Sequence, residues 1–527
     1  MVKFQTKPFG SPSILLYMVI PATLWFGSCH GPSRENQDGA TLAKQYCATC
    51  HSFPEPSLAD RNSWLTGILP GMGPRLGIFQ YSGIKYPNER NLPGVPPYYY
   101  PSKPLLSATQ WQAILNYYYT VAPENPLPQH RDEPIHPGLH LFQVEIPKTP
   151  PSHPPITTCL VLDPGNHLIY SCDGMDRRVS VYDRNLNLKT SLQAQSPVTW
   201  IDFGDSLTRK GPRKGILTDI GILPPSELKA GSIQELEVDE NGNASISGKT
   251  IADSLHRPVE VLQADLNGDG RTDLVVCDFG NLTGELFWLE NQGNGVYIRH
   301  LLRDQPGAIK ACIRRDSHSG LPDIWVLFAQ GDESLFKFEN EGHGQFLEKR
   351  VLQFPPINGS SSFELDDFNG DGYPDILYTC GDNSDYSKIL KNYHGVYIFL
   401  NDGKDHFTER FFYPINGCYK AMARDFRNNG KLDIATIAFF ADYQHQPEES
   451  FVYFENEGGM KFRPFTMPIS GLGRWITMDA GDLYGNGKQD IILGNFSVGP
   501  SNMPSLPEWN TDPPFIVLKN ISGPSHP

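Results

Sequence analysis

The sequence predicts a multidomain protein in which a small all-α domain precedes an all-β, seven-bladed propeller. A chain of 527 residues is too long for one hydrophobic core, so at least two domains are expected. The 49 glycines and 46 prolines suit an all-β body with many turns. A strand pattern recurs through the C-terminal two thirds, and helical patterns precede it. The expected boundaries are a signal segment at 1–28, a helical domain at 29–125, a linker at 126–155 and the propeller at 156–527.

The first 28 residues have the pattern of a signal peptide. Lys3 and Lys7 precede an apolar run, 14–26, which is short and contains a proline, so it does not predict a membrane-spanning helix. The run ends in Phe-Gly-Ser before Cys29, which resembles a bacterial lipoprotein signal and implies that Cys29 is lipidated. Ordinary cleavage that discards Cys29 is the alternative. We expect a location in the bacterial cell envelope, periplasmic or at the outer-membrane surface, with the lipid anchor as the only membrane attachment.

Residues 47–51, Cys-Ala-Thr-Cys-His, form the most specific motif in the chain. Two thiols three positions apart on a helical turn can add to the two vinyl groups of a haem, and the following imidazole becomes the proximal iron ligand. A zinc half-site or a redox dithiol shares the spacing. However, no second CxxC or paired histidine follows at zinc spacing, and no βαβ pattern surrounds the motif. Cys47, Cys50 and His51 therefore predict covalently bound haem c.

Two helices are expected around this motif. Residues 39–50 and 107–121 both place apolar side chains at helical spacing, and the second segment begins with a serine cap. This arrangement is similar to the cytochrome c family, in which an N-terminal helix bearing CxxCH crosses a C-terminal helix through glycine and aromatic contacts. The resemblance covers roughly ninety residues. It implies that the crossing is formed by Gly39, Tyr46, Trp111 and Tyr118.

A six-coordinate haem also needs a distal ligand. Met72 is the only methionine between the motif and the end of the helical domain, and no further histidine occurs until His130. We therefore expect Met72 to bind the iron, which would raise the reduction potential relative to two histidine ligands. His130, His136 or an open position are alternatives, and Met72 could instead fill a gap in the core or lie on a loop.

The rest of the chain repeats one unit of strands. Apolar and aromatic strands that end in Asn recur at 286–291, 335–340, 396–401 and 451–456. Each is preceded by an Asp-containing turn between two strand-like runs. The turns are anchored at Asp163, Asp202, Asp265, Asp316, Asp367, Asp425 and Asp482. Seven units with the period of four-stranded blades predict a seven-bladed β-propeller.

The last unit ends before its fourth strand. It contains strand-like residues at 475–479, 490–494 and 515–520 only. Propellers close the ring and so avoid an exposed edge. Residues 139–146, within a linker rich in Pro and His, alternate as a half-buried strand does. We expect this segment to supply the missing outer strand of the final blade.

Two turns have the oxygen-rich pattern of a calcium loop. Oxygen side chains fall at positions 1, 3, 5 and 9, glycine occupies position 6, and position 7 offers its carbonyl. The residues are Asp265, Asn267, Asp269, Arg271 and Asp273 in one loop, and Asp367, Asn369, Asp371, Tyr373 and Asp375 in the other. The pattern resembles the FG-GAP/VCBS repeat family, which implies calcium-binding blades over most of residues 156–522. A hairpin turn satisfied by backbone hydrogen bonds is the alternative.

Two further turns keep only part of this pattern, and we expect weaker calcium sites there. Their retained residues are Asp425, Asn429 and Asp433 in one turn, and Asp482, Asn486 and Asp490 in the other. Arg427 and Tyr484 take the third position. A salt bridge from Arg427 could replace the ion.

Basic and aromatic residues at the beginnings of inner strands could line the mouth of the propeller channel: His256, Arg257, Lys310, Lys420, Arg474 and Trp475. Such a funnel would suit an anionic or carbohydrate ligand, or a partner loop. Channel-lining residues paired with nearby Asp are the alternative. The six propeller cysteines could form disulfides, with Cys159 and Cys172 as the favoured pair, or remain free thiols.

Two functions follow from these features. In the first, the haem passes electrons between envelope proteins, and the propeller is a docking or ligand-recognition platform. In the second, the propeller is an oxidoreductase domain whose reaction feeds electrons to the haem. No acid/base dyad, nucleophile elbow or quinoprotein tryptophan pattern is present, so we favour the first. A purely adhesive protein would leave the haem unexplained, and a net charge of −15 argues against non-specific nucleic-acid binding.

Overall fold

A computed structural model describes residues 38–88, 92–148, 150–204, 210–239, 241–316, 319–499 and 506–523. The expected signal segment and Cys29 lie outside these residues. Asp38–Pro527 forms one compact unit. Within the described ranges, no helix has both the length and the apolar character that crossing a membrane requires.

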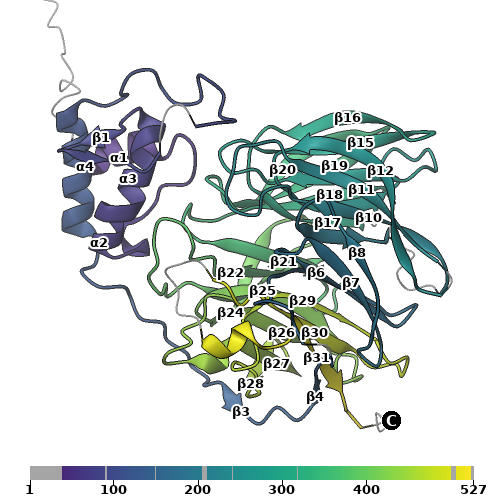
Figure 1. Cartoon of the computed structure of the whole chain (residues 1–527). Coiled ribbons are helices and arrows are strands. Elements are labelled where there is room, and N and C mark those ends of the chain that lie inside the picture. Colours follow the sequence, from purple (N-terminus) through teal and green to yellow (C-terminus); the bar gives the residue numbers. More distant parts are fainter. Residues whose placement is uncertain are drawn as a thin grey trace, which may run out of the picture. The chain divides into compact units, whose positions relative to one another are not determined.

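The N-terminal part of the described chain is helical (Figure 1). Helix α1 (Gly39–Cys47) begins after Asp38, whose carboxylate accepts the Thr41 backbone N–H at 2.7 Å. Helix α4 (Ala108–Val121) begins with a capping box formed by Ser107 and Gln110. Between them lie η2 (Pro56–Leu58), α2 (Arg61–Ser63), η3 (Trp64–Ile68), α3 (Leu69–Met72), η4 (Gly73–Leu76), β1 (Gln80–Tyr81) and β2 (Ile84–Lys85).

Helices α1 and α4 cross closely at Gly39. A Cβ atom at this position would lie 2.0 Å from the Ala113 carbonyl oxygen, so only glycine permits the approach. Tyr118 donates to the Pro54 carbonyl oxygen at 2.8 Å, and its ring lies 4.2 Å from that of Trp64. Helix α1 ends at Cys47, earlier than the expected residue 50, because 48–50 form a turn.

Apart from the small β1–β2 sheet, the strands form seven sheets, six with four strands and one with five, which confirms the predicted seven-bladed propeller. Blade I contains β5 (Thr157–Asp163), β6 (Leu168–Asp173), β7 (Arg178–Asp183) and β8 (Leu188–Gln193). Blade II contains β9 (Val198–Asp202), β10 (Arg213–Asp219), β11 (Gly231–Val238) and β12 (Ala244–Leu255). Blade III contains β13 (Pro258–Ala264), β14 (Asp273–Asp278), β15 (Glu285–Gly293) and β16 (Val296–Arg303). Blade IV contains β17 (Ala308–Arg315), β18 (Pro322–Phe328), β19 (Ser334–Gly342) and β20 (Gln345–Gln353).

The last three blades follow the same antiparallel order. Blade V contains β21 (Ser360–Asp366), β22 (Asp375–Cys380), β23 (Gly395–Asn401) and β24 (Phe407–Pro414). Blade VI contains β25 (Cys418–Arg424), β26 (Asp433–Ala438), β27 (Phe451–Gly458) and β28 (Lys461–Thr466), and the short β3 (His136–Pro137) pairs with β28. Blade VII contains β29 (Trp475–Gly481), β30 (Asp490–Asn495), β31 (Phe515–Asn520) and β4 (Phe142–Glu145). Short helices η6 (Pro447–Ser450) and η7 (Pro507–Asn510) lie in loops.

Strand β4 closes the ring. It pairs antiparallel with β31, with Phe142 opposite Asn520 and Glu145 opposite Val517. This is the pairing that the sequence predicts for residues 139–146. The strand spans fewer residues than expected, and the preceding linker adds β3 to blade VI, which the sequence did not indicate.

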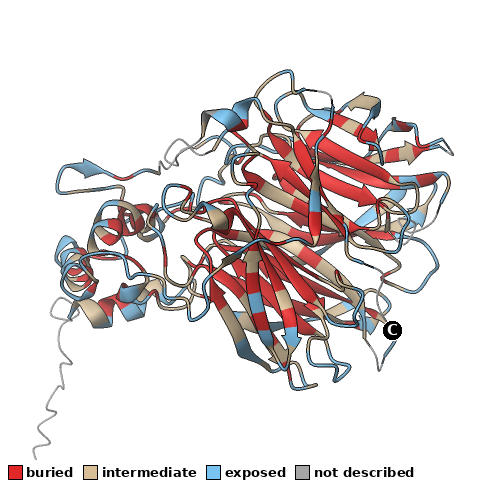
Figure 2. Ribbon diagram, turned by 90° about the horizontal axis from the view of Figure 1, so that it is seen from below, coloured by how far each residue is buried: buried red, intermediate tan, exposed pale blue. Residues whose placement is uncertain are grey.

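The core of each blade lies in its middle strands (Figure 2). Every residue of β14, β18, β22, β26 and β30 is buried, because neighbouring blades cover both faces of these strands. Outer strands such as β16 and β20 are largely exposed or half-buried. The contiguous apolar runs in the sequence mark the middle strands for this reason.

A hydrogen-bonded Asp and Asn pair explains the recurring Asn at the end of the third strand. In blade III, buried Asp273 accepts the Asn291 backbone N–H at 2.8 Å, and the Asn291 side chain donates to the Thr272 carbonyl oxygen. The same pairing joins Asp323 to Asn340, Asp375 to Asn401, Asp433 to Asn456 and Asp490 to Asn520. The motif therefore fixes the second and third strands of a blade in register.

Carboxylates on the inner strands connect neighbouring blades. Asp202 accepts the Gln263 backbone N–H at 3.0 Å, and Glu364 accepts that of Ala423 at 3.0 Å. In the same way, Glu260 accepts the backbone N–H of Ala311, and Asp479 accepts that of Leu162. Burial raises the pKa of Asp202 to about 6. These acidic groups thus hold the ring together.

Candidate functional sites

His51 is held in the tautomer that an iron ligand needs. Its Nδ1 lies 2.8 Å from the Ser52 carbonyl oxygen, and a carbonyl can only accept, so Nδ1 carries the proton. The lone pair of Nε2 is then available to a metal. Burial lowers the pKa of His51, which favours the neutral ring at neutral pH.

The two cysteines of the motif are free thiols. Cys47 is partly buried at the end of α1, and burial raises its pKa to about 11, whereas Cys50 is exposed. A redox dithiol needs a lowered thiol pKa, so this environment does not suit that alternative. Zinc binding would bring the Cys47, Cys50 and His51 ligand atoms together. Among the described residues they do not converge within 4.8 Å of one another.

Met72 is the last residue of α3 and is partly exposed. The two alternative distal ligands lie in other surroundings. His130 has 88% of its side chain exposed, and His136 lies in β3, where it is hydrogen-bonded to Glu133 and paired with blade VI. Met72 is thus the sequence-predicted distal residue that belongs to the helical segment itself.

The helical segment that carries the motif contacts loops of the propeller. The Ser52 hydroxyl donates to the Phe354 carbonyl oxygen at 3.0 Å, and the Tyr393 hydroxyl donates to that of Leu58 at 3.1 Å. The Tyr386 ring packs on Gly71, where a Cβ atom would lie 2.5 Å from it. Sequence patterns did not indicate these contacts, because the residues are separated by some three hundred positions.

The two full calcium-type loops share one backbone conformation. Asp265 accepts the backbone N–H groups of Gly268, Asp269 and Gly270 at 2.9–3.1 Å. Asp367 accepts those of Gly370, Asp371 and Gly372 at 2.8–3.2 Å. The alternative expected from the sequence, a turn satisfied by backbone bonds, therefore accounts for the first residue of each loop.

Electrostatics in these loops favour a cation. Asp273 and Asp375 are fully buried, and burial raises the pKa of both, with a further increase from the two other carboxylates of each loop. In the first loop, Arg271 forms an ion pair with Asp269. Position 7 of the second loop is Tyr373, so Asp371 has no such partner there. The Asp367 loop is consequently the better calcium candidate.

The two partial loops differ from each other. Arg427 donates to both oxygens of Asp433, at 2.7 and 2.9 Å, so a guanidinium stands where the ion was expected. This contact favours the salt-bridge alternative over the weaker calcium site expected at Asp425, Asn429 and Asp433, which stays a prediction. In the other loop, Asp482 accepts N–H groups from Asn486 and Gly487, and the Tyr484 hydroxyl turns to Glu145. Asp490 has its pKa raised to about 6 by burial.

Most of the residues expected at the channel mouth have structural partners. Arg257 donates to the carbonyl oxygens of Ile222, Leu223 and Gly280. Lys310 forms an ion pair with Glu260. Arg474 is fully buried and donates from Nε to the Phe439 carbonyl oxygen at 2.9 Å, although its two terminal nitrogens have no hydrogen-bond partner among the described residues. Trp475 is fully buried. Burial lowers the pKa of Lys420. These contacts favour the structural alternative for the mouth residues over a ligand-binding funnel.

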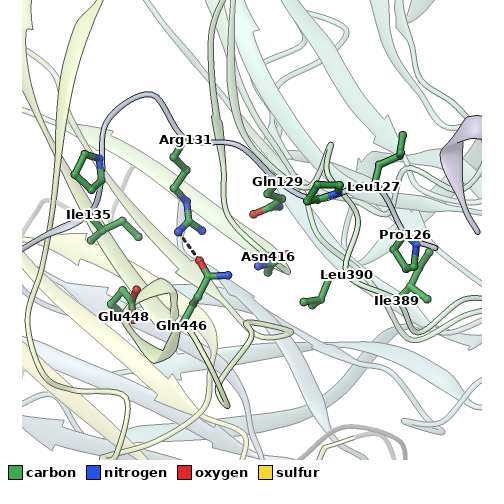
Figure 3. A pocket seen from close by; sticks show the side chains of 12 residues that line it. Pro126, Leu127, Gln129, Arg131, Ile135, Ile389, Leu390, Asn416, Gln446 and Glu448 are labelled. Carbon is green, nitrogen blue, oxygen red and sulfur yellow. Dashed lines mark hydrogen bonds between the residues drawn. The ribbon is translucent and has the colours of Figure 1, made fainter. Parts of the chain in front are cut away.

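The linker borders a hollow of about 700 Å³ on blades V and VI (Figure 3). Arg131 reaches across it, with its Nη1 2.7 Å from Gln446 Oε1, and also pairs with buried Glu449. Gln129 donates to the carbonyl oxygens of Lys391 and His394. The segment expected to be mainly a linker is therefore fixed to the propeller by side chains.

The cysteines of the propeller are free thiols in the part of the chain that the structure describes. Cys159 and Cys172 lie directly opposite each other on β5 and β6, and both are buried. The pairing predicted from the sequence thus joins neighbouring residues, although no disulfide is formed between them.

Comparison with known proteins supports the FG-GAP-like repeat. A family model described as FG-GAP-like repeat matches residues 318–378, which include the Asp367 loop. Among solved structures, Sqt1 of Saccharomyces cerevisiae is similar, with a TM-score of 0.44 and 9% identity over 72% of this chain and 100% of that chain. The Dos1 propeller gives 0.41 and 8% over 69% and 77%. Among curated proteins, none matches the chain.

The class of protein that the fold defines is therefore a seven-bladed all-β propeller with an FG-GAP-like repeat. The matched repeat covers only blades IV and V in part, so it does not extend to the helical segment.

Proposed function

We propose that the protein is an electron-transfer protein of the bacterial cell envelope, with haem c attached through Cys47 and Cys50. The observation that supports this most strongly is the His51 tautomer, in which Nδ1 donates to the Ser52 carbonyl and Nε2 is available. When bound, the haem supplies one-electron chemistry. His51 and Met72 are the residues that would hold the iron of this haem.

In this proposal the propeller is a platform for redox partner proteins, and calcium stiffens its Asp265 and Asp367 loops. Ser52 and Leu58 are hydrogen-bonded to Phe354 and Tyr393, which lie in loops before and within blade V. These contacts attach the helical segment with the CxxCH motif to the propeller. Cys29 supplies a lipid anchor. An anionic or carbohydrate ligand at the channel mouth is not needed for this function.

Covalent haem attachment tests the proposal directly. The full chain, made in a host with working haem-attachment machinery, should keep its colour after denaturation, and the double variant Cys47→Ala/Cys50→Ala should lose it. Cys312→Ala, which removes a half-buried propeller thiol, is the matched control and should stay coloured. A colourless wild-type chain with both motif thiols free to react would refute the proposal.

Reduction by small molecules separates the two functions expected from the sequence. A haem that is reduced only by a protein partner supports the electron carrier. If a small molecule present in the envelope reduces it rapidly without any partner, the oxidoreductase alternative gains the support.

A further inference from the structure

We propose a binding site for a divalent transition-metal ion of the zinc type at one edge of blade III, formed by His256, Asp278 and Glu285. One ligand atom from each residue lies within 4.8 Å of the other two, and this is the one group of three such residues that converges in the described part of the chain. The site is separate from the haem motif and from the calcium-type loops.

The sheet positions all three residues. His256 lies two residues before β13, Asp278 ends β14, and Glu285 begins β15. Asp278 is paired with Pro258 on one side and directly opposite Glu285 on the other. Because opposite residues of antiparallel strands project from the same face, the two carboxylates share one side of the sheet. A rigid strand edge thus fixes the donor set.

Asp278 lacks the partners that its equivalents in blades I and II have. Each of these residues ends the second strand of its blade and accepts a backbone N–H from just before the first strand. The other oxygen of Asp173 accepts the backbone N–H groups of Met175 and Asp176. The other oxygen of Asp219 accepts hydrogen bonds from the Gln234 side-chain amide and the Ser232 hydroxyl.

The remaining Asp278 oxygen, Oδ1, is buried without any hydrogen-bond partner among the described residues, and the whole residue is only 1% exposed. A buried carboxylate oxygen without a partner is unfavourable, because it has lost its hydrogen bonds to water and gained none in return. A metal ion bound to Asp278 would provide the missing partner.

The imidazole beside it is also available. His256 Nδ1 lies 3.6 Å from Asp278 Oδ2, which is too long for a hydrogen bond. The side chain is 14% exposed, so the site is open to an ion from solvent. In blade I a histidine also lies near the corresponding aspartate, but His153 is 3.0 Å from Asp176 and 3.6 Å from Asp173.

Glu285 already has a supporting residue. Arg299 forms an ion pair with one of its oxygens and packs on the Phe287 ring, 4.4 Å from the ring centroid. One Glu285 oxygen can stay with Arg299 while the other binds the ion, so that the guanidinium orients a metal ligand from outside. Arg299 also balances part of the charge of the two carboxylates.

The donor chemistry selects the metal class. One imidazole nitrogen and two carboxylate oxygens suit Zn²⁺, Mn²⁺ or Fe²⁺, whereas Ca²⁺ prefers oxygen ligands alone. Bonds of about 2.0–2.1 Å place tetrahedral zinc ligands roughly 3.3 Å apart. The three ligand atoms, now within 4.8 Å of one another, would have to move closer to the ion, which the partial exposure of the Glu285 side chain allows.

Zinc alone is the probe for the test. Full-length protein without a metal-affinity tag, in saturating calcium, should retain a single zinc ion after desalting, measured by metal analysis and by calorimetric titration. Asp278→Asn and His256→Gln should each weaken zinc binding by more than about 100-fold. A loss of about 100-fold is the upper limit expected when the removed residue only supports a metal ligand. Glu285→Gln repeats the test if either variant fails to fold.

Two further variants make the outcome specific. His153→Gln, which changes a histidine beside Asp173 and Asp176 in blade I, should leave zinc binding unchanged. Cys47→Ala/Cys50→Ala should also keep the ion, which separates this site from zinc held by the CxxCH motif. If the wild-type chain retains no zinc, or if its zinc is lost with the two cysteines and not with Asp278→Asn, the proposal is wrong. Haem attachment is measured separately and does not enter this result.

Discussion

The hydrogen bond from His51 to the Ser52 carbonyl shows how one backbone group prepares a ligand. Without it, neutral imidazole has two tautomers, and only one of them presents Nε2 to a metal. With it, the tautomer that carries its proton on Nδ1 satisfies the half-buried ring of His51 and leaves Nε2 available. The sequence motif identifies His51 as the candidate ligand, but the Ser52 carbonyl determines which ring nitrogen carries the proton.

Met72 can be tested at the same scale. Met72→Ala should abolish the sulfur-to-iron absorption band at the near-infrared edge of the oxidised spectrum and lower the reduction potential. Met175→Ala, at a residue 49% exposed on the propeller, should change neither quantity. An unchanged band in Met72→Ala would remove Met72 as the ligand.

The buried carboxyl group of Glu333 should make the free energy of unfolding depend on pH. It is fully buried next to β19, accepts the Ser360 backbone N–H at 2.8 Å, and burial raises its pKa from 4.5 to about 7. The folded protein therefore binds this proton more tightly than the unfolded chain does. The associated stability is fully present below pH 4.5 and is lost as the pH rises to about 7.

The size of this effect is about 3 kcal/mol, from a pKa shift at 1.36 kcal/mol per unit. Glu333→Gln should remove it, so that the free energy of unfolding of the variant falls less than that of the wild type between pH 4.5 and 7.5. Denaturant unfolding in the presence of chelator measures the difference. Parallel curves for the two proteins would contradict the assignment.

At the scale of elements, the turns of blades V and VI differ in whether the chain itself supplies a positive charge for a buried carboxylate. Both place a buried Asp at position 9, Asp375 or Asp433. In blade VI, Arg427 neutralises this residue from within the chain. In blade V the third position is Asn369, which carries no charge to neutralise Asp375. This difference predicts which loop depends on calcium.

Chelation should lower the melting temperature of the propeller, because an ion that binds only the folded state stabilises it by mass action. Asp367→Ala should shrink that response. Asp425→Ala, the same substitution in the loop with Arg427, should destabilise the fold but leave the response to chelator intact. Equal responses in the wild type and Asp367→Ala would rule out calcium at this loop.

At the scale of the whole molecule, the ring is closed by a strand from a distant part of the chain. Phe142 of β4 is 4% exposed and packs on Phe426 and Tyr453, with ring centroids 5.8 and 5.7 Å away. Phe142→Ala should cost about 3–5 kcal/mol of unfolding free energy.

Ile146→Ala, just beyond β4 and 43% exposed, is the control and should cost under about 1 kcal/mol. Denaturant unfolding followed by tryptophan fluorescence measures both. A similar small loss in the two variants would mean that β4 does not hold the ring closed.

Much of the architecture follows from local sequence patterns. The Asn-terminated strands and Asp-containing turns recur because each blade needs the same hydrogen bonds, such as Asp273 to Asn291. The missing fourth strand of the last blade followed from the rule that an edge must be paired. The CxxCH motif likewise has a fixed spacing, because a haem has two vinyl groups at a fixed distance from its iron.

Other features depend on contacts that no local pattern contains. His256, Asp278 and Glu285 meet only because the register of β13, β14 and β15 aligns them. The sequence offered a salt bridge from Arg427 as an alternative to an ion, and the structure identifies its partner as Asp433.

The sequence by itself determined the blade count, the closing strand and the candidate haem ligands, since these depend on spacing along the chain. Only the tertiary structure decided which charged groups are neutralised by neighbours and which are left without a partner. That depends on strand register and burial, which join residues far apart in sequence.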